Sequence, residues 1–423
     1  MDKTKLETAI GTSRKWDARE AGREVARNTI KNLNAPPNFF LLFSSIHYET
    51  HGGFQEFLNG VWEVLPEGTP LVGGTVSGFI NPQGCYTRGA TALAMSYPNM
   101  NVAIGVGYNT KRNPKKAAMQ ATKMIKQKLD FTYRNRFLLQ LVSAGNVPNI
   151  IARKKVVKGI SKTLALNLYG FSLKVLQTGV GREDEIHDIT TNEFKEFNIL
   201  GGSLLDSMRI MNNYQFYNKK VLENALLLLA MSLDLNTNVC TTLGMKETDN
   251  EFTITKMSAD KRVVHEIDGK PASKRLLELL NWPEDYFDET IYRRIFYYPL
   301  AFKDGDRIIP EVIPLVLGDS LLFTYQTKNP KVTILSTSGE GLISAVTENL
   351  DKHRSITPAL GLISSCAIRL QTLGSNIFKV REALMDYFKE KPFLLFYVGG
   401  EMSYSPENGL RYGNDTFNTA IFW

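Results

Sequence analysis

The chain has 423 residues, of which 43% are hydrophobic and 22% are charged, and its formal net charge is +7. This length exceeds what one hydrophobic core supports, so we expect two or three domains, and no apolar run approaches the roughly 18 to 20 residues of a membrane-spanning helix. The N-terminus lacks the apolar segment of a secretory signal, and the three cysteines are too widely spaced for a disulfide framework or a zinc pattern. These features predict a cytoplasmic protein that does not enter a membrane.

The first hundred residues alternate between helix-like and strand-like segments. Residues 1–35 are polar and charged, and apolar spacing within residues 13–31 predicts one amphipathic helix, so we treat this part as an N-terminal helical extension. Residues 39–45 are a short apolar run, which predicts a strand covered on both faces. We also expect a helix over residues 53–65, strands over residues 71–79, 89–96 and 102–108, and a basic helix over residues 113–129.

A turn rich in glycine recurs along the chain. The pair Gly73-Gly74 is followed by the strand-like triplet Ala94-Met95-Ser96, and the pair Gly201-Gly202 is followed by Ala230-Met231-Ser232. A degenerate third copy is recognisable near the C-terminus, where Val398-Gly-Gly-Glu-Met402 aligns with Val76-Ser-Gly-Phe-Ile80. Self-similarity in a fixed order predicts an internal repeat of strand, glycine turn and strand.

The remaining segments predict the fold class. Residues 137–143 resemble the apolar run at residues 39–45, and the domain boundary is placed after residue 270, where a turn leads into a helix. Helices mixed with strands of both apolar and alternating character predict an α+β fold, with layered mixed sheets flanked by helices and arranged in two lobes. Further strands are expected over residues 224–232, 239–244, 252–257, 262–267 and 415–422, and a helix over residues 273–280.

Two charged residues in the last third of the chain suit a zwitterionic ligand. Arg369 ends a largely apolar run, where its guanidinium can bind a carboxylate through two hydrogen bonds or pair with an acidic neighbour as a structural group. Glu401 lies in a Gly-Gly-Glu turn, where its carboxylate can hold an ammonium group or cap nearby N–H groups. Together they favour a ligand that resembles an amino acid.

Hydroxyl, aromatic and thiol side chains supply further candidates. Thr75 and Ser77 alternate with Val76, so both hydroxyl groups face one side of a strand, where they either line a pocket or bond to local backbone. Tyr397 serves as an aromatic wall or as core packing. Cys366 has no histidine near it in the sequence, which favours a packing thiol over a nucleophile.

Motifs for metals and cofactors are incomplete in the sequence. The cluster His47-Tyr-Glu-Thr-His51 has the wrong order for a zinc-binding helix, and Gly105-Val-Gly107 and Gly179-Val-Gly181 lack the third glycine of a dinucleotide loop. There is no phosphate-binding loop of the Walker type. We therefore expect no metal and no cofactor.

The glycine turns and the C-terminal motifs resemble the FIST family, in which an N-terminal and a C-terminal FIST domain are paired. Val72-Gly-Gly-Thr-Val-Ser-Gly-Phe-Ile80 and Ile199-Leu-Gly-Gly-Ser-Leu-Leu-Asp206 resemble its glycine turns, and Val264-His-Glu-Ile-Asp-Gly-Lys-Pro-Ala272 is similar to the segment that joins its domains. Ser364-Ser-Cys-Ala-Ile-Arg369 and Phe396-Tyr-Val-Gly-Gly-Glu-Met402 resemble motifs of its C-terminal half.

The resemblance implies residues 36–270 as a FIST N-terminal-type domain with an internal duplication and residues 271–423 as a FIST C-terminal-type domain. It also implies a sensory module that binds a small ligand such as an amino acid or a similar polar metabolite. Phe79 stands where the N-terminal motif usually has Glu, so one carboxylate is missing from that turn. No fused output segment is recognisable, so a signal would pass through a partner protein.

The sequence thus predicts a small-ligand-binding sensory protein without catalysis of its own, with Arg369, Glu401 and Cys366 at the centre of its pocket. Two alternatives stay open. One is a small-molecule transferase or hydrolase that uses Cys366 or Ser365. The other is a scaffold whose basic surface, chiefly the helix at residues 113–129, binds an acidic partner. Nucleic acid is not an expected partner, because no recognisable nucleic-acid-binding module is present.

Overall fold

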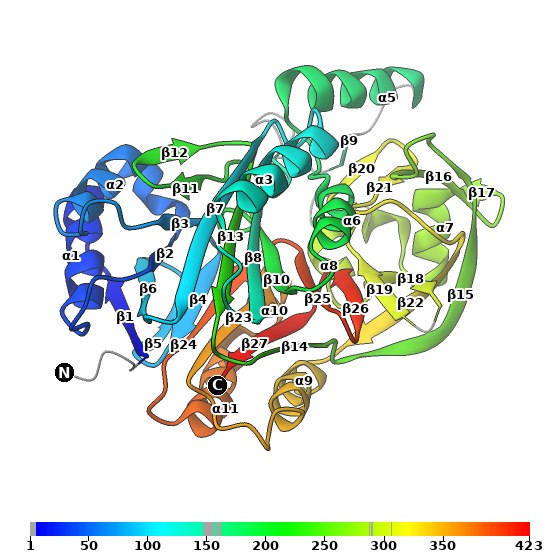
Figure 1. The fold of residues 1–423 in the computed structure, drawn as a ribbon. Coiled ribbons are helices and arrows are strands. Elements are labelled where there is room, and N and C mark those ends of the chain that lie inside the picture. Colours follow the sequence, from blue (N-terminus) through cyan, green and yellow to red (C-terminus); the bar gives the residue numbers. More distant parts are fainter. Residues whose placement is uncertain (1–5, 147–155, 158–161, 287, 289–290, 306) are drawn as a thin grey trace.

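A computed structural model describes residues 6–146, 156–157, 162–286, 288, 291–305 and 307–423. The chain folds as mixed β-sheets flanked by helices, so the predicted α+β class is confirmed. Figure 1 shows a larger body with three sheets and a smaller lobe built around a fourth sheet. No helix within the described part of the chain combines the length and apolar character that a bilayer crossing requires.

The first sheet has the strand order β1-β6-β2-β3-β11-β12. Strands β2 and β3 are parallel, β6 pairs with β2 in antiparallel fashion, and β1 pairs with β6 in antiparallel fashion. Helices α1 (Ala18–Ile30) and α2 (Phe54–Trp62) pack against each other beside this sheet (Figure 1). Its strands are β1 (Glu7–Ser13), β6 (Ala90–Ser96), β2 (Phe39–Ser44), β3 (Leu71–Thr75), β11 (Gln215–Tyr217) and β12 (Lys220–Leu222).

The second sheet has the order β26-β25-β10-β8-β13-β7 and contains a parallel pair, β8 and β10. Helices α3 (Pro114–Lys128) and α6 (Glu183–Glu193) contact each other, and α3 packs on β7 and β13. Between β8 and α6 the chain forms α5 (Lys162–Phe171) and the π-helix η2 (Ser172–Leu176). The strands are β26 (Gly409–Gly413), β25 (Glu401–Ser405), β10 (Asn198–Leu204), β8 (Asn135–Ser143), β13 (Ala225–Leu233) and β7 (Met100–Tyr108).

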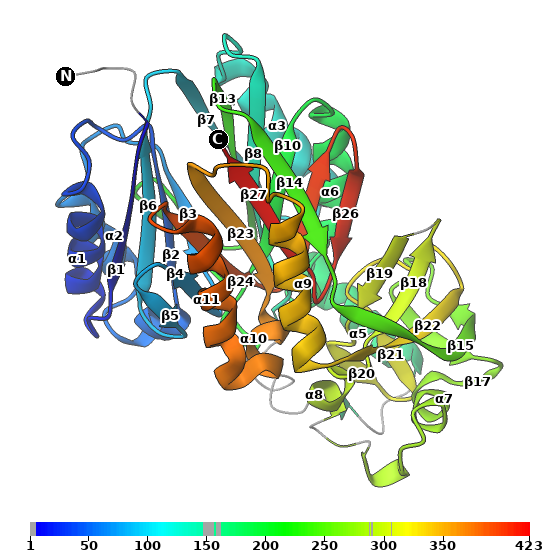
Figure 2. The same ribbon diagram turned by 90° about the horizontal axis from the view of Figure 1, so that it is seen from below.

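The third sheet has the order β14-β27-β23-β24-β4-β5, with β23 and β24 parallel. Helices α9 (Gly339–Asp351), α10 (Ala367–Leu373) and α11 (Ile377–Phe388) cover it, as Figure 2 shows. The strands are β14 (Thr237–Thr242), β27 (Phe417–Phe422), β23 (Leu360–Cys366), β24 (Phe393–Val398), β4 (Gly78–Asn81) and β5 (Gly84–Tyr86).

Each of these three sheets receives a hairpin from another part of the chain. The hairpin β4–β5 follows β3 of the first sheet but pairs with β24 of the third. The hairpin β11–β12 follows β10 of the second sheet but pairs with β3 of the first, and β25–β26 follows β24 of the third but pairs with β10 of the second. Segments on either side of residue 270 are therefore paired within the same sheets.

A closed ring of backbone hydrogen bonds joins the carboxyl ends of β3, β10 and β24. The N–H of Leu205 donates to the carbonyl of Thr75 over 3.2 Å, and the N–H of Ser77 donates to the carbonyl of Tyr397 over 3.0 Å. The N–H of Gly399 donates to the carbonyl of Ser203 over 2.8 Å and completes the ring. In each strand the acceptor precedes the donor by two residues, so the three strand ends hold corresponding positions.

The smaller lobe is an insertion between β14 and α9, and β9, which precedes α5 in the chain, adds an edge strand to its sheet. Its sheet has the order β19-β18-β22-β15-β16-β21-β20-β9, with β17 paired to β16. The lobe also contains α7 (Ala272–Leu279), η3 (Glu284–Tyr286) and α8 (Ile291–Ile295). The strands are β9 (Val156–Val157), β15 (Met245–Met257), β16 (Val263–Ile267), β17 (Lys270–Pro271), β18 (Leu300–Asp304), β19 (Arg307–Glu311), β20 (Leu315–Leu317), β21 (Ser320–Leu322) and β22 (Lys331–Thr337).

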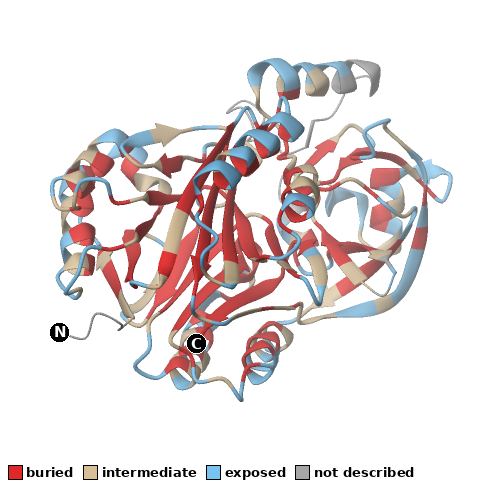
Figure 3. Ribbon diagram, viewed as in Figure 1, coloured by how far each residue is buried: buried red, intermediate tan, exposed pale blue. Residues whose placement is uncertain are grey.

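The apolar strands are buried on both faces, as the sequence predicts. On β2, Phe39, Leu41 and Phe43 join the central cluster shared by the three sheets, while Phe40 and Leu42 pack under α1 and α2. The same alternation recurs on β8 and β24. Figure 3 shows these strands as buried and the outer helix faces as exposed. Because each strand lies between two apolar layers, it has no polar face.

The N-terminal part differs in detail from its prediction. A helix forms within residues 13–31, but it begins at Ala18, with the side chain of Asp17 accepting from the N–H of Glu20 as an N-cap. The residues before it form β1, which pairs with β6 along its whole length. The segment expected as a helical extension thus also supplies a strand of the first sheet. Its polar residues gave no strand signal because β1 lies at the sheet edge.

Candidate functional site

A cavity of about 430 Å³ lies beside the carboxyl ends of β8, β10, β23 and β24. Ala144 and Gly145 follow β8, Leu205 follows β10, Cys366 ends β23, and Gly399 follows β24. Leu205 and Gly399 are also members of the hydrogen-bonded ring. The carboxyl ends of parallel strands are the usual place for ligands in open sheets of this kind, and the volume falls in the range of about 300–1,000 Å³ that small-ligand pockets occupy.

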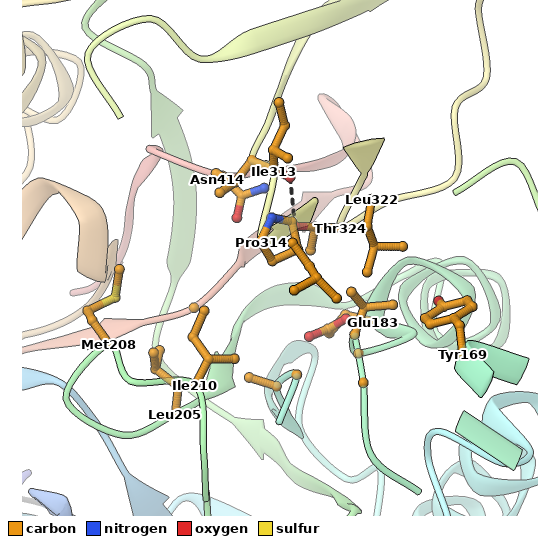
Figure 4. Close-up of a pocket in the computed structure, with 18 of the residues that line it drawn as sticks. Tyr169, Glu183, Leu205, Met208, Ile210, Ile313, Pro314, Leu322, Thr324 and Asn414 are labelled. Atoms are coloured by element: carbon orange, nitrogen blue, oxygen red, sulfur yellow. Dashed lines mark hydrogen bonds between the residues drawn. The ribbon is translucent and has the colours of Figure 1, made fainter. Parts of the chain in front are cut away.

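The walls of this cavity are mostly apolar and come from distant segments. Figure 4 shows Leu205, Met208 and Ile210 on one side, and Ile313, Pro314 and Leu322 from the smaller lobe on another. These lobe residues lie on or beside β20 and β21, which pair with each other, and β21 also pairs with β16 in the fourth sheet. The π-helix and α5 supply further apolar residues, among them Leu168, Tyr169, Phe171 and Leu176.

The loop after β10 has an unusual backbone. Met208 and Ile210 both have positive φ, at 66° and 58°, and such a conformation costs a β-branched residue about 1–3 kcal/mol. Asp206 stabilises the turn, because its carboxylate oxygens accept from the N–H groups of Ile210 and Met211, each over 2.9 Å. The turn held by Asp206 places the side chains of Met208 and Ile210 on the cavity wall.

Glu183 supplies a buried carboxyl group to the cavity. It is the first residue of α6, its exposed fraction is 3%, and Oε2 has no hydrogen-bond partner among the described residues. Burial, together with the nearby charge of Asp184, raises the pKa of Glu183 to about 7, and the positive charges of Arg262 and Lys111 oppose the shift. A carboxyl group with this pKa can donate or accept a hydrogen bond near neutral pH.

Lys111 is itself fully buried behind this wall. Its Nζ donates to Oδ1 of Asn224 over 2.6 Å and to Oγ of Ser143 over 3.2 Å. Burial lowers the pKa of Lys111 to about 8, and the attraction of Glu183 opposes that change. The lysine therefore acts on the cavity through its charge, since its amine already has polar partners.

Asn414 is the second polar group of the wall. It lies between β26 and β27 and is 1% exposed, and its Nδ2 lacks a hydrogen-bond acceptor in the part of the chain that the structure describes. An amide donor of this kind is costly to bury without a partner. Glu183 and Asn414 thus offer unpaired polar atoms to a cavity whose other walls are mainly apolar.

The structure places Arg369 in the core beneath the third sheet, outside the described lining of the cavity. Its guanidinium donates to the backbone carbonyls of Leu243, Asp415 and Leu342 over 3.0, 3.1 and 2.6 Å. The side chain is 1% exposed. Arg369 therefore joins β14, α9 and the start of β27 through their carbonyl oxygens.

Glu401 and Cys366 lie next to each other near the cavity. Oε2 of Glu401 accepts from the N–H and the hydroxyl group of Thr416 over 3.2 and 3.0 Å. Burial raises the pKa of Glu401 well above its usual value, while the Thr416 hydroxyl and the Cys366 thiol oppose the shift. Burial and the charges of Glu401 and Asp415 also raise the pKa of Cys366 well above its usual value, so the thiol stays protonated.

The remaining candidates have local partners. Oγ1 of Thr75 accepts from the N–H of Tyr214 over 3.0 Å, and the hydroxyl of Ser77 donates to the carbonyl of Asp206 over 2.5 Å. Ser365 is buried within β23, and Tyr397 is buried within β24. Of the candidate residues predicted from sequence, Cys366 is the one among the described lining residues of the cavity.

Asp415 makes a pH-dependent contribution to stability that can be measured. It is fully buried beside Arg369, and neither carboxylate oxygen has a hydrogen-bond partner among the described residues. Burial raises its pKa from 3.8 to about 7, against the charge of Arg369. Because the folded-state pKa is raised, this contribution is complete below pH about 4 and is lost as the pH rises through about 7.

We therefore expect the free energy of unfolding of the wild type to fall by about 2–4 kcal/mol as the pH rises from 4 to 8 because of Asp415. In Asp415→Asn this fall should be absent. Urea unfolding of both proteins at one-unit pH intervals measures this difference. The exposed Asp351→Asn serves as the control and should keep the wild-type slope. Equal slopes for Asp415→Asn and wild type would show that Asp415 is ionised in the folded protein without cost.

Sequence reasoning missed Glu183 and Asn414. A signal was present in Gly179-Val-Gly181, which precedes the acidic start of α6. A Cβ on Gly181 would lie 2.0 Å from Oε1 of Glu183, so the glycine leaves the space that the carboxyl group occupies. Asn414 carried no comparable signal, because its role depends on strands that meet only in the folded chain.

A family model for the FIST N domain matches residues 38–270, which is more than half of the chain. This match defines a FIST protein, and the chain belongs to the FIST family. It is 26% identical over 234 residues to the uncharacterized protein MJ1623 from Methanocaldococcus jannaschii. The aligned region covers 52% of this chain and 44% of that protein. The alignment thus spans less than half the length of this relative.

Two solved structures show weak overall similarity. A cyanuric acid hydrolase from A. caulinodans gives a TM-score of 0.29 at 7% identity, covering 55% of this chain and 72% of that chain. PurLQS from Thermotoga maritima gives a TM-score of 0.19 at 12% identity, covering 99% of this chain and 72% of that chain. These TM-scores are too low to carry over a fold or an activity.

Proposed function

We propose that this protein is a sensor that binds a small ligand in the cavity beside β8, β10, β23 and β24 and passes the signal to a partner protein. The observation that carries the proposal is a cavity of about 430 Å³ with unpaired, buried polar atoms on Glu183 and Asn414. A pocket with mainly apolar walls and few polar groups is the common form of a small-molecule site. The FIST family membership supports the same function.

The position of the cavity also suits a sensor. Its walls join the three-sheet body to the smaller lobe, so a bound ligand would contact both. A ligand that contacts both parts in one arrangement shifts the population toward that arrangement. We infer that the arrangement of the smaller lobe on the body is what a partner protein would read.

We further infer that the chain is built from related units, with a FIST N-terminal-type domain over residues 36–270 and a FIST C-terminal-type domain over residues 271–423. The shared strand order of the three sheets supports the related units, as do the corresponding positions in the hydrogen-bonded ring. In this scheme Thr75, Ser203 and Tyr397 are equivalent, and so are Ser77, Leu205 and Gly399.

A transferase or hydrolase that uses Cys366 or Ser365 fits the site less well. Nucleophilic attack requires a thiolate or a hydroxyl group beside a base. The thiol of Cys366 has a raised pKa and carboxyl neighbours that oppose its ionisation. Binding without bond cleavage is therefore the function that the geometry supports best.

A ligand screen tests the proposed function. Thermal unfolding is measured against amino acids, polar metabolites and apolar compounds, because a ligand that binds only the folded state raises the unfolding temperature. We expect a compound in the panel to raise it in a concentration-dependent way. Ile210→Trp should abolish that increase, since the larger side chain fills the cavity that Ile210 lines.

The matched control is Phe378→Trp, which enlarges an exposed side chain on α11, away from the described lining of the cavity. It should keep the full ligand-induced increase. The same increase in Ile210→Trp would show that the ligand binds elsewhere, and the absence of any stabilising compound in a broad panel would count against a small-ligand sensor.

A further inference from the structure

The charges around the cavity restrict the ligand that it can hold. Among the lining residues that the structure describes, Glu183 is the one with an ordinarily ionised side chain. Tyr169 and Cys366 also line the cavity, but burial raises both pKa values, so both groups are uncharged near neutral pH. Within the described wall, therefore, a ligand carboxylate meets no cation.

Arg369 does not supply a cation to the described wall of the cavity. Its guanidinium already donates to three backbone carbonyls and lies outside the described lining. The other buried cation, Lys111, bonds to Ser143 and Asn224. A carboxylate transferred from water into this cavity meets the amide donor of Asn414 but no cation, so it loses most of its hydration with little in return. The cavity therefore disfavours free amino acids and other carboxylates.

A cationic head group is disfavoured for a different reason. Glu183 offers a carboxyl group, but the buried charge of Lys111 lies close enough to lower the pKa of that group. An ammonium ion next to Glu183 would be repelled by Lys111. A neutral head group that donates a hydrogen bond to Glu183, or accepts one from it, avoids both the loss of carboxylate hydration and the repulsion by Lys111.

The mouth of the cavity is apolar as well. Leu168, Phe171 and Leu176 line the cavity from α5 and η2, yet their exposed fractions are 51%, 53% and 56%. Figure 1 shows this segment standing away from the sheets at the edge of the molecule. Clustered exposed apolar side chains mark a binding surface, and π-helical turns are frequent at functional sites. A ligand with an apolar body would cover them.

We propose that the ligand is a neutral molecule with an extended apolar body and a single hydrogen-bonding head, such as an amide or an alcohol. The inference rests on the proposed function and names its ligand class. The head meets Oε2 of Glu183 inside the cavity, and the body runs between the apolar walls toward Phe171 and Leu176. Gly181 keeps the head site open, because a Cβ there would displace the carboxyl group of Glu183.

Four probes with one apolar body and different heads test this inference by calorimetry at pH 7. They are octanamide (neutral), octanoate (anionic), octylammonium (cationic) and 2-aminooctanoate (zwitterionic). We expect octanamide to bind at least about tenfold more tightly than each of the other three. Glu183→Met should weaken the binding of octanamide about tenfold, because methionine keeps the side-chain volume in the wall but loses the carboxyl group. Gly181→Ala should also weaken the binding of octanamide.

Glu193→Met is the matched control, because Glu193 ends the same helix, pairs with Lys126 and is exposed. It should leave octanamide binding unchanged. Tighter binding of octanoate, octylammonium or 2-aminooctanoate would overturn the ligand class while keeping the proposed function. Octanamide binding that is unaffected by both Glu183→Met and Gly181→Ala would overturn the head site. Failure of all four probes overturns the ligand class, and the proposed function falls only if the broad screen also finds no ligand.

Discussion

Replacing Arg369 with methionine is expected to lower the free energy of unfolding by about 3–5 kcal/mol. The guanidinium satisfies the carbonyl oxygens of Leu243, Leu342 and Asp415, all in the interior of the third sheet and its helices. Methionine keeps much of the side-chain volume but donates no hydrogen bond, so these carbonyls lose their donor. Urea unfolding at pH 7, followed by circular dichroism, measures the loss.

The matched control is Arg354→Met. Arg354 is exposed and makes a surface ion pair with Asp351, so its loss should change the free energy of unfolding by less than about 1 kcal/mol. The comparison also tests the earlier expectation that Arg369 clamps a ligand. If that expectation holds, Arg369→Met would leave the ligand-free protein nearly as stable as wild type and would abolish only the stabilisation by ligand.

Replacing Arg262 with methionine is expected to cost a similar amount, about 3–5 kcal/mol. Arg262 is buried and pairs with Oδ1 of Asp184 over 2.5 Å, and it also bonds to the carbonyl of Thr324. Oδ2 of Asp184 accepts from the N–H of Gln326 over 2.9 Å. These contacts join α6 to the smaller lobe next to the cavity-lining residues Glu183 and Thr324. Removing one member leaves a buried carboxylate without its cation.

The double variant Arg262→Met/Asp184→Asn separates this effect from simple loss of packing. It should recover part of the stability lost in Arg262→Met, because the unpaired charge is removed as well. Urea unfolding of the wild type, the two single variants and the double variant gives the coupling free energy. Additive losses would show that the two side chains act independently.

Much of the fold could be predicted from local patterns. The apolar runs at residues 39–45 and 137–143 predict buried strands because apolar layers cover both of their faces, and β2 and β8 confirm them. The spacing over residues 113–129 predicts α3, whose Asn113 caps its N-terminus by accepting from the N–H of Lys116. Such signals are local, so tertiary contacts did not alter them.

The site was harder to predict because its chemistry depends on partners. Arg369 has the residue type that binds a carboxylate, yet three carbonyls from distant segments take its donors. Glu183 looks like one of three acidic residues at the start of a helix. Only the folded chain shows that Oε2 of Glu183 has no partner among the described residues and adjoins a cavity.

The sequence by itself determined the class of fold, many helices and strands of the N-terminal two thirds, and the family, because each follows from periodicity and motifs within short stretches. The pairs Gly73-Gly74 and Gly201-Gly202 were expected as turns, but they lie inside strands β3 and β10, where a Cβ on Gly73 would lie 1.7 Å from the carbonyl oxygen of Leu42. Only the tertiary structure decided which hairpin completes which sheet and where the cavity lies. Its walls come from residues 144 to 414, and whether a buried polar atom is paired or free depends on neighbours that no stretch of sequence contains.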